Sequence, residues 1–350
     1  MSEANQHGFA TQTAGRARDA GARVGVGVTP FQTDADATIR LAVAAEQLGY
    51  ARFGCAEGWT HDTLVLLAQI AGVTSRIGLA TGVLPVWSRT PAAIAMAAAS
   101  LQRASDGRFA LGLGASSPPL VEGLHGMTWQ QPVNRIRTTL FAVRALLDGA
   151  RLPLDRENVR ALRLGAPPDR RVPILLAALA PSSVRLAGEL ADHWLPFLWA
   201  RSRLPDGRTL LAEGEARAEG STATAVAASV PLAIGPDEQT ARQIAAGWLV
   251  TYLTRMGPLY PRMLRDQFGF AREVDALLDA NANGGPPRLP AAAERLAREV
   301  TVMGTHDEAP HSIRLWLEAG AEQRQSPNFP PGPTSPVAPP GRSEGQPTHA

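Results

Sequence analysis

The sequence predicts an α/β fold and, within that class, a closed (β/α)8 barrel, or TIM barrel. Eight short apolar runs are each followed by a segment with helical spacing of apolar residues. This alternation is typical of parallel strands joined by helices, and a count of eight favours a closed barrel over an open doubly wound sheet. The longest intervals follow the fourth and seventh runs, so insertions are expected there, on the face where such barrels carry their sites.

The expected elements alternate along the chain. The strands are expected at residues 24–29, 51–56, 77–84, 109–113, 173–179, 193–198, 225–234 and 300–304. The helices are expected at residues 36–48, 62–72, 91–104, 132–148, 181–191, 205–219 and 308–319. Pro91, Pro132 and Pro181 mark helix starts, because proline has the φ angle of a first helical turn and its missing amide is not needed there. Residues 116–131 are expected to form a loop.

Three further segments complete the chain. Between the seventh and eighth strands, Trp248, Tyr252 and Tyr260 recur at roughly helical spacing, which indicates either an amphipathic helix packed on the barrel or a substrate lid or dimer face. Residues 1–22 are polar without periodicity and are expected to be a disordered leader. Residues 323–350 are rich in Pro, Gly and Ser and are expected to be a disordered tail. The folded domain should therefore span residues 23–322.

Composition narrows the chemistry. The 350 residues are 45% hydrophobic with a formal charge of +2, and the basic residues are spread out, so nucleic-acid binding is not expected. Every basic residue is Arg, which excludes a Schiff-base lysine and a phosphate loop that needs lysine. The single Cys55 cannot form an intramolecular disulfide. With no long apolar run and no signal peptide, the protein is expected in the cytoplasm, away from membranes.

The fourth strand ends in a glycine-rich stretch, SDGRFALGLGASS, at residues 105–117. Small residues at a strand end indicate that something approaches the backbone closely. Gly112 and Gly114 supply two glycines of a dinucleotide-binding GxGxxG, but Ser117 takes the third place. The following Pro118 and Pro119 are expected to obstruct the helix that this motif requires. The nicotinamide reading is therefore disfavoured.

Residues at strand carboxyl ends are the site candidates in a barrel, and most of them here are small and neutral. Glu57 is the sole carboxylate among them. The histidines have no metal-ligand spacing, a second carboxylate for glycoside hydrolysis is not evident, and no GxSxG motif is present. No metal site is expected, and a cofactor must supply the reactivity. The stretch from Ala177 to Val184, AALAPSSV, is either an anion site at a helix start or an ordinary proline-started helix.

Five motifs in order resemble the luciferase-like monooxygenase superfamily, and more narrowly its branch of F420-dependent (deazaflavin) oxidoreductases. They are RFALGLGASSPPLVEGLHGM, AEGWTHD, LATGVLPVWSRTPAAIAMAAASL, ILLAALAPSSVRLAGELADHW and MGTHDEA. The resemblance implies a barrel that holds coenzyme F420 or FMN over the strand ends. This sequence departs from the sugar-phosphate dehydrogenases of the family at two places. It has Glu57-Gly58 where those enzymes have Asp-His, and Ser117 where they have Glu. Oxidation of sugar phosphates is therefore not expected.

The resemblance also implies roles for individual residues. Gly82 and Val83 match a pair that often forms a non-proline cis peptide beneath the ring. The residues implied to hold the cofactor are Ala56, Gly82, Val83, Gly112, Gly114, Ala115, Ala177, Ala178, Leu179 and Ser182. Glu57 is expected to donate or accept a proton in apolar surroundings, and Trp59, Trp87 and Ser117 to face the substrate. Arg89 and Arg135 are candidates for anionic groups, or are simply solvated surface residues.

Three functions stay open at this point. The first is transfer of a hydride between F420 and an organic small-molecule substrate. The second is an FMN-dependent monooxygenase that uses oxygen and a separate flavin reductase, and the third is a cofactor-free barrel that acts as a binding protein. A homodimer is expected for the enzyme.

Overall fold

The computed structural model describes residues 24–153, 158–218 and 223–321. Its main sheet curls with all strands parallel, in the order β1-β2-β3-β5-β6-β7-β8, and β4 pairs with β5. These strands are β1 (Gly25–Val28), β2 (Arg52–Cys55), β3 (Gly78–Thr81), β4 (Leu84–Pro85), β5 (Phe109–Gly114), β6 (Ile174–Leu176), β7 (His193–Trp194) and β8 (Ala225–Val226). A second sheet pairs β9 (Leu232–Gly235) with β10 (Val302–Thr305) in parallel.

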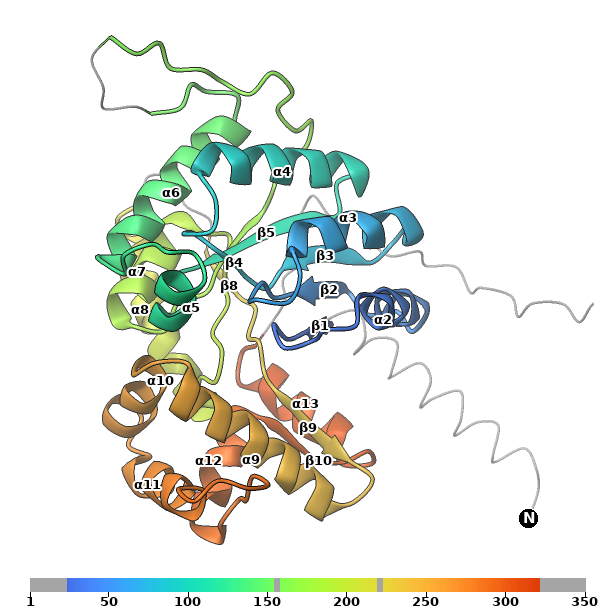
Figure 1. The fold of residues 1–350 in the computed structure, drawn as a ribbon, viewed down its shortest axis with the longest axis vertical. Helices are drawn as coiled ribbons and strands as arrows, with labels where there is room; N and C mark the ends of the chain where they lie inside the picture. Colours follow the sequence, from blue (N-terminus) through green and yellow to red (C-terminus); the bar gives the residue numbers. More distant parts are fainter. Residues whose placement is uncertain (1–23, 154–157, 219–222, 322–350) are drawn as a thin grey trace, which may run out of the picture.

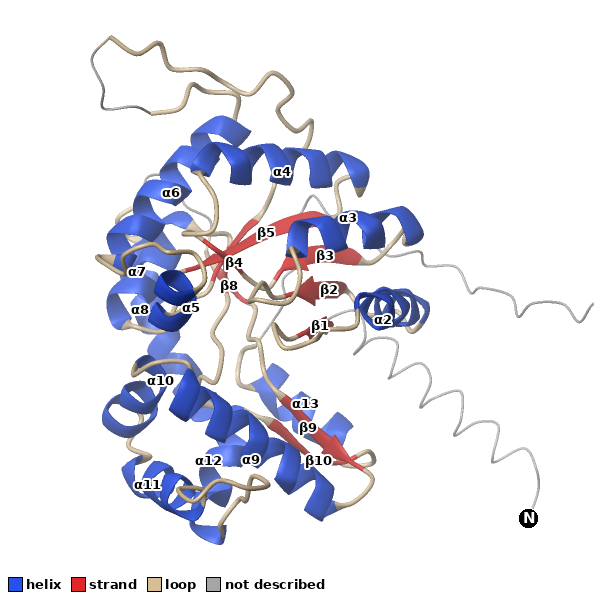
Figure 2. Ribbon diagram, viewed as in Figure 1, coloured by secondary structure: helices blue, strands red, loops and turns tan. Residues whose placement is uncertain are grey.

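Helices cover the outside of the curled sheet (Figures 1 and 2). Around the main sheet these are α2 (Ala35–Gln47), α3 (Thr63–Val73), α4 (Pro91–Ala104), α5 (Pro118–Gly123), α6 (Pro132–Leu147), α7 (Pro181–Leu190) and α8 (Leu204–Glu215). The lower lobe of Figure 1 holds β9 and β10 with α9 (Glu238–Arg255), α10 (Leu259–Arg262), α11 (Ala271–Ala280), α12 (Glu294–Val300) and α13 (Ala309–Glu318). The expected leader and tail lie outside the described residues.

The helix starts agree with the sequence-based expectation. α4, α6 and α7 begin at Pro91, Pro132 and Pro181. Asp62, at the expected start of the second helix, is the N-cap of α3, and its carboxylate accepts hydrogen bonds from the Leu64 and Val65 amides at 2.9 and 3.2 Å. Such caps satisfy amides that the helix itself leaves unpaired.

The loop expected at residues 116–131 contains a short helix, so the expectation was wrong on this point. Helix α5 begins at Pro118 itself, directly after Ser117. Pro118 and Pro119 open the helix because residues of a first helical turn have no partner for their amides. The stretch therefore differs from a dinucleotide-binding motif because Ser117 replaces the third glycine, and not because prolines follow it.

A closed eight-stranded barrel is not confirmed. The expected seventh strand breaks between Val226 and Leu232 into β8, which pairs with β7, and β9, which pairs with β10. Proline has no amide to donate to a sheet, and Pro231 lies directly before β9. Within the described residues β10 pairs with β9 alone and β1 with β2 alone, so the fold is a curled parallel half-barrel with a second lobe.

Buried polar residues lie at the end of the sheet where the strands begin. The Arg108 guanidinium donates to the carbonyl oxygens of Ile77 at 2.7 Å and Thr74 at 2.9 Å. His193, which opens β7, is only 3% exposed, and its Nδ1 has no hydrogen-bond partner in the described part of the chain. Burial, followed by the charge of Arg52, lowers the pKa of His193 from 6.5 to about 4.

His193 should therefore make stability depend on pH. Below pH 6.5 the unfolded chain takes up a proton on this side chain, whereas the folded chain keeps it neutral down to about pH 4. The free energy of unfolding is expected to fall as the pH drops through this window, by about 3 kcal/mol in total. Denaturant unfolding of the wild type and His193→Gln at pH 7 and pH 4.5 measures it. The variant should lose less stability than the wild type, and equal losses would refute this assignment.

Candidate active site at the strand ends

The carboxyl ends of β2 and β3 are tied together by backbone hydrogen bonds. The Gly82 amide donates to the Cys55 carbonyl at 2.7 Å, and the Glu57 amide donates to the Val83 carbonyl at 3.1 Å. The peptide bond between Gly82 and Val83 is cis, as the resemblance implied for this pair. Ala56, Gly82 and Val83 are each partly exposed. Backbone and small side chains therefore form the surface at this edge.

Glu57 belongs to a charged cluster. Its side chain is 6% exposed, and Oε1 accepts a hydrogen bond from Arg89 Nη1 at 2.6 Å. Oε2 accepts from the Thr63 amide at 3.3 Å, and Arg89 Nη2 binds Asp62 Oδ2 at 2.6 Å. The expectation that Glu57 lies in apolar surroundings was therefore wrong. Both oxygens already have partners, so a proton transfer would require one of these hydrogen bonds to open.

Arg89 holds two carboxylates and is no longer a free cation. Burial lowers the pKa of its guanidinium, but the hydrogen bonds and charges of Glu57 and Asp62 outweigh that and raise the pKa above its ordinary value. For Asp62, burial alone would raise the pKa of the carboxyl group. The hydrogen bonds and charge of Arg89 and the amides at the start of α3 outweigh burial, so the pKa is lowered. Sequence reasoning could not find this cluster, because Glu57 and Arg89 lie 32 residues apart.

Gly112 and Gly114 are buried and pack against the chain itself. The Gly112 amide donates to Thr81 Oγ1 at 2.7 Å, and that hydroxyl donates back to the Gly112 carbonyl at 2.7 Å. A Cβ on Gly112 would overlap the Thr81 carbonyl oxygen, and one on Gly114 would lie 2.8 Å from Val83 Cγ2. These glycines therefore allow β3 and the segment between β3 and β4 to lie close to β5. Ala115, one residue further, is partly exposed at the edge.

The three expected substrate residues differ in their surroundings. Trp59 is 51% exposed and meets Phe31 edge to face, with ring centroids 5.3 Å apart. Trp87 is 7% exposed, packs on Trp129 at 5.8 Å, and has Arg135 over its ring at 5.2 Å. Ser117 is 6% exposed, and its Oγ has no hydrogen-bond partner within residues 24–153, 158–218 and 223–321.

The end of β6 and the start of α7 continue the edge. The Ala177 amide donates to the Leu113 carbonyl at 2.9 Å, which places Ala177 beside Gly114, and Ala177 stays partly exposed. Ala178 and Leu179 are buried, and the Ala178 carbonyl accepts from Trp194 Nε1 at 2.8 Å. Ser182 is exposed in the first turn of α7.

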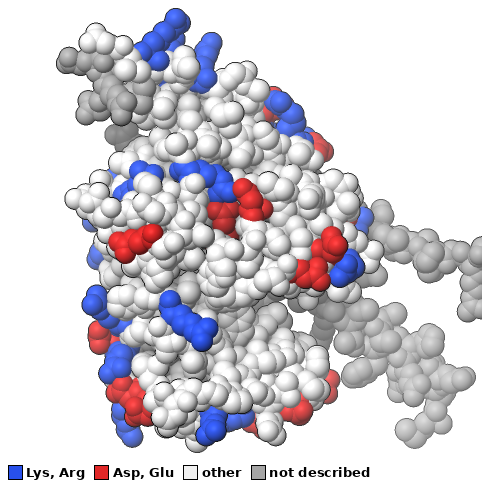
Figure 3. All heavy atoms as spheres, viewed as in Figure 1, with Lys and Arg blue, Asp and Glu red and all other residues white. Residues whose placement is uncertain are grey.

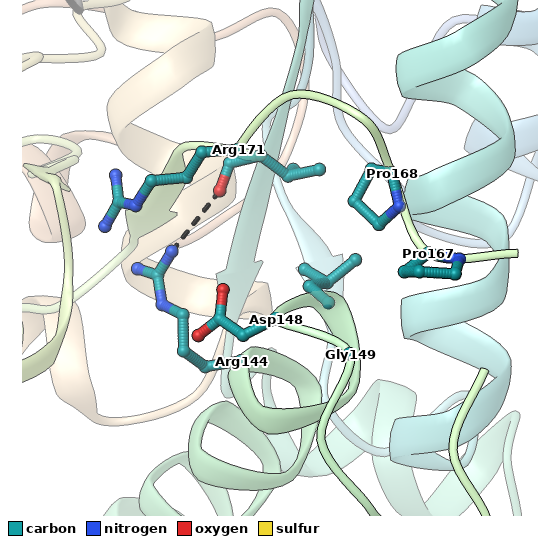
Figure 4. Close-up of a pocket in the computed structure, with 8 residues that line it drawn as sticks. Arg144, Asp148, Gly149, Pro167, Pro168 and Arg171 are labelled. Atoms are coloured by element: carbon teal, nitrogen blue, oxygen red, sulfur yellow. Dashed lines mark hydrogen bonds between the residues drawn. The ribbon is translucent and has the colours of Figure 1, made fainter.

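Two surface hollows lie away from the strand carboxyl ends. One of about 300 Å³ lies where β6 begins, between the end of α6 and Pro167, Pro168 and Arg171 (Figure 4). Its cations are already paired, because Asp192 binds both Arg144, at 3.1 Å, and Arg171, at 2.5 Å. The other, of about 640 Å³, lies between the start of α9 and residues 286–289. On the face shown in Figure 3, basic and acidic residues are interspersed without a broad patch of one sign.

Parallel strands with small residues at their carboxyl ends are the arrangement in which α/β enzymes carry their sites. A family model described as luciferase-like monooxygenase matches residues 8–323. The chain belongs to this family.

Among its relatives is a Mycobacterium tuberculosis protein provisionally named a coenzyme F420-dependent oxidoreductase. The two are 30% identical over 332 residues, which cover 86% of this chain and 94% of the relative. A 5,10-methylenetetrahydromethanopterin reductase of Archaeoglobus fulgidus is 27% identical over 74% of this chain and 79% of its own length.

Solved structures share the fold. The coenzyme F420-dependent tetrahydromethanopterin reductase of Methanopyrus kandleri superposes with a TM-score of 0.68 at 20% identity, covering 86% of this chain and 91% of that one. An F420-dependent secondary alcohol dehydrogenase in complex with an F420-acetone adduct gives the same score and coverage at 18% identity.

Among the described residues, no helix has both the length and the apolar character needed to cross a membrane.

Proposed function

We propose that this protein is an oxidoreductase that binds coenzyme F420 at the carboxyl ends of β2 to β6 and exchanges a hydride with an organic substrate. One observation carries the proposal: Ala56, Gly82, Val83, Ala115 and Ala177 lie partly exposed along one edge, where a flat ring system can approach the backbone. The names of the M. tuberculosis relative and of two proteins with the same fold support the choice of cofactor.

The residues present fit such a ligand. Ser117 Oγ is buried at this edge without a partner in the described residues, and a buried polar group of this kind costs about 1–3 kcal/mol. A ligand with polar ring atoms would remove that cost. On the other side, the exposed Ser182 and the start of α7 favour an anionic group, because a helix N-terminus carries partial positive charge. We therefore assign the phosphate to residues 177–182, with Ala178 and Leu179 shaping the loop.

When bound, the deazaflavin supplies a ring carbon that gives or accepts a hydride. The chain's own contribution is to position. Gly112 and Gly114 let β5 approach Thr81 and Val83, which fixes the floor of the site. The pair of Glu57 and Arg89 fixes the loop after β2 beside that floor. Glu57 directly follows Ala56, which is part of the exposed edge. Its carboxylate can take up a proton if its bond to Arg89 opens.

A titration tests the choice of cofactor. Dialysed full-length protein is titrated with F420 and, separately, with FMN, and binding is followed by fluorescence. We expect F420 to bind and FMN to bind much more weakly. Ala115→Leu should weaken F420 binding at least about tenfold because the new side chain covers the edge, whereas Ala68→Leu, on the exposed face of α3, should leave it unchanged.

The other outcomes each support a rival. Tight FMN binding without F420 binding would favour the flavin monooxygenase with a separate reductase, which the family's name also covers. A folded protein that binds neither cofactor would favour a binding protein.

A homodimer also stays a prediction. The outer face of α3 and α4, where Val65, Val73 and Met96 are all more than half exposed, is the surface to examine by sedimentation.

A further inference from the structure

Six aromatic side chains from distant parts of the chain form one cluster. The aromatic cluster consists of Phe31, Trp59, Phe197, Trp248, Tyr252 and Tyr260. Tyr252 is its centre, with ring centroids 4.7 Å from Phe197, 5.2 Å from Tyr260 and 6.2 Å from Phe31. The aromatic residues of α9 and α10 that recur at helical spacing in the sequence thus contact residues that follow β1 and β7.

The cluster lies at the same edge as the proposed cofactor site. Phe31 and Trp59 come from the loops that follow the carboxyl ends of β1 and β2, and Phe197 from the segment after β7. The turn between α9 and α10 reaches the start of α5, because a Cβ on Gly257 would lie 3.6 Å from Pro118 Cδ. Trp248 anchors α9 by donating from Nε1 to the Leu232 carbonyl at 3.1 Å. The end of α9, the turn after it and α10 therefore contact segments that follow β1, β5 and β7.

Exposure separates this cluster from the aromatic core. In that core, Trp199 contacts both Trp194 and Phe268, and none of the three is more than 6% exposed. In the aromatic cluster, Tyr252 is buried but Trp59 is half exposed, and the other four rings are partly exposed. Aromatic rings that contact one another and still keep exposed surface can bind a flat apolar partner.

The buried centre of the aromatic cluster carries a hydroxyl group, that of Tyr252. Arg89, the guanidinium closest in sequence to Trp59 at this edge, is held by Glu57 and Asp62. The hydroxyl of Tyr252 makes no hydrogen bond within the described residues. Burial raises the pKa of Tyr252, so this hydroxyl keeps its proton and can donate it to an acceptor.

We propose that the aromatic cluster binds the substrate and selects an uncharged, flat ring compound with an oxygen that accepts a hydrogen bond from Tyr252, such as an aryl or cyclic ketone. The inference rests on the proposed function in that the bound compound is taken as the hydride acceptor or donor. An anionic compound would lose hydration against these uncharged rings, which disfavours it.

Three probes of one shape test the proposal on the full-length protein. They are 2-acetonaphthone, which is neutral with a ketone oxygen, 2-naphthoate, which is anionic, and naphthalene, which has no oxygen. Binding is measured by quenching of tryptophan fluorescence, with and without F420. We expect 2-acetonaphthone to bind at least about tenfold more tightly than 2-naphthoate. Equal or tighter binding of 2-naphthoate would overturn the proposal.

Two matched variants test the hydroxyl. Tyr252→Phe should weaken binding of 2-acetonaphthone about five- to tenfold, as expected for one lost hydrogen bond, and leave binding of naphthalene unchanged. Tyr50→Phe makes the same chemical change before β2, at the other end of the sheet, and should change neither. Equal effects of the two variants would contradict a specific role for Tyr252.

The F420 titration on the same samples separates this inference from the proposed function. Binding of F420 without binding of 2-acetonaphthone would overturn the substrate site and leave the cofactor assignment standing. Binding of 2-acetonaphthone that responds to Tyr252→Phe, without binding of F420, would support the aromatic site and overturn the cofactor.

Discussion

Gly112→Ala is expected to lower the free energy of unfolding by about 3 kcal/mol. The reason is steric, because the added Cβ would overlap the carbonyl oxygen of Thr81, and backbone cannot move aside as a flexible side chain can. The reciprocal hydrogen bonds between Gly112 and Thr81 would have to lengthen at the same time. Chemical denaturation of the purified variant measures the loss.

Gly54→Ala is the matched control. Gly54 lies in β2 of the same sheet, and the atom nearest to its added Cβ would be the Ala80 carbonyl oxygen at 4.0 Å. That is an ordinary contact, so this variant should lie within about 1 kcal/mol of the wild type. Comparable stabilities of the two variants would show that β5 does not need glycine for its approach to β3.

Arg89→Met is expected to lower the free energy of unfolding by a similar amount. It leaves the Glu57 carboxylate, 6% exposed, with only the Thr63 amide as a partner. Removing one partner of a buried pair costs about 3 kcal/mol, because the remaining charge keeps its desolvation penalty. The loss is expected at neutral pH in denaturant unfolding.

A double variant identifies the cause of that loss. Glu57→Gln in the Arg89→Met background removes the stranded charge, so most of the lost stability should return. Arg40→Met serves as the control, because Arg40 and its partner Asp34 are 71% and 57% exposed and 3.9 Å apart, and should change stability by less than about 1 kcal/mol. Additive losses in the double variant would contradict a coupled buried pair.

Local signals predicted the fold well where one residue decides the structure. Pro91, Pro132 and Pro181 start helices because the requirement at a first helical turn is local. The same principle was misapplied at Pro118, which starts α5. The apolar run at residues 225–234 predicted a strand, but its two halves pair with different neighbours, which hydrophobic pattern alone does not encode.

The sequence predicted a location for the candidate site but not the contacts among its residues. Small residues at strand ends indicated the edge, and the resemblance identified the Gly82–Val83 pair. The partners of Glu57 were missed because Arg89 lies 32 residues further along the chain, after β3 and β4. Similarly, the helical spacing of Trp248 and Tyr252 indicated an apolar face, but not that Phe31 and Phe197 cover it.

A crystal structure of the protein with F420 would show directly where the cofactor binds. The proposal predicts the deazaflavin ring against Gly82, Val83 and Ala115, with the phosphate near Ser182. The ring face turned away from the strands should look toward Tyr252 in the aromatic cluster. F420 bound elsewhere, for example in the hollow beside Arg144 and Arg171, with the strand-end edge left free, would rule out this placement of the cofactor.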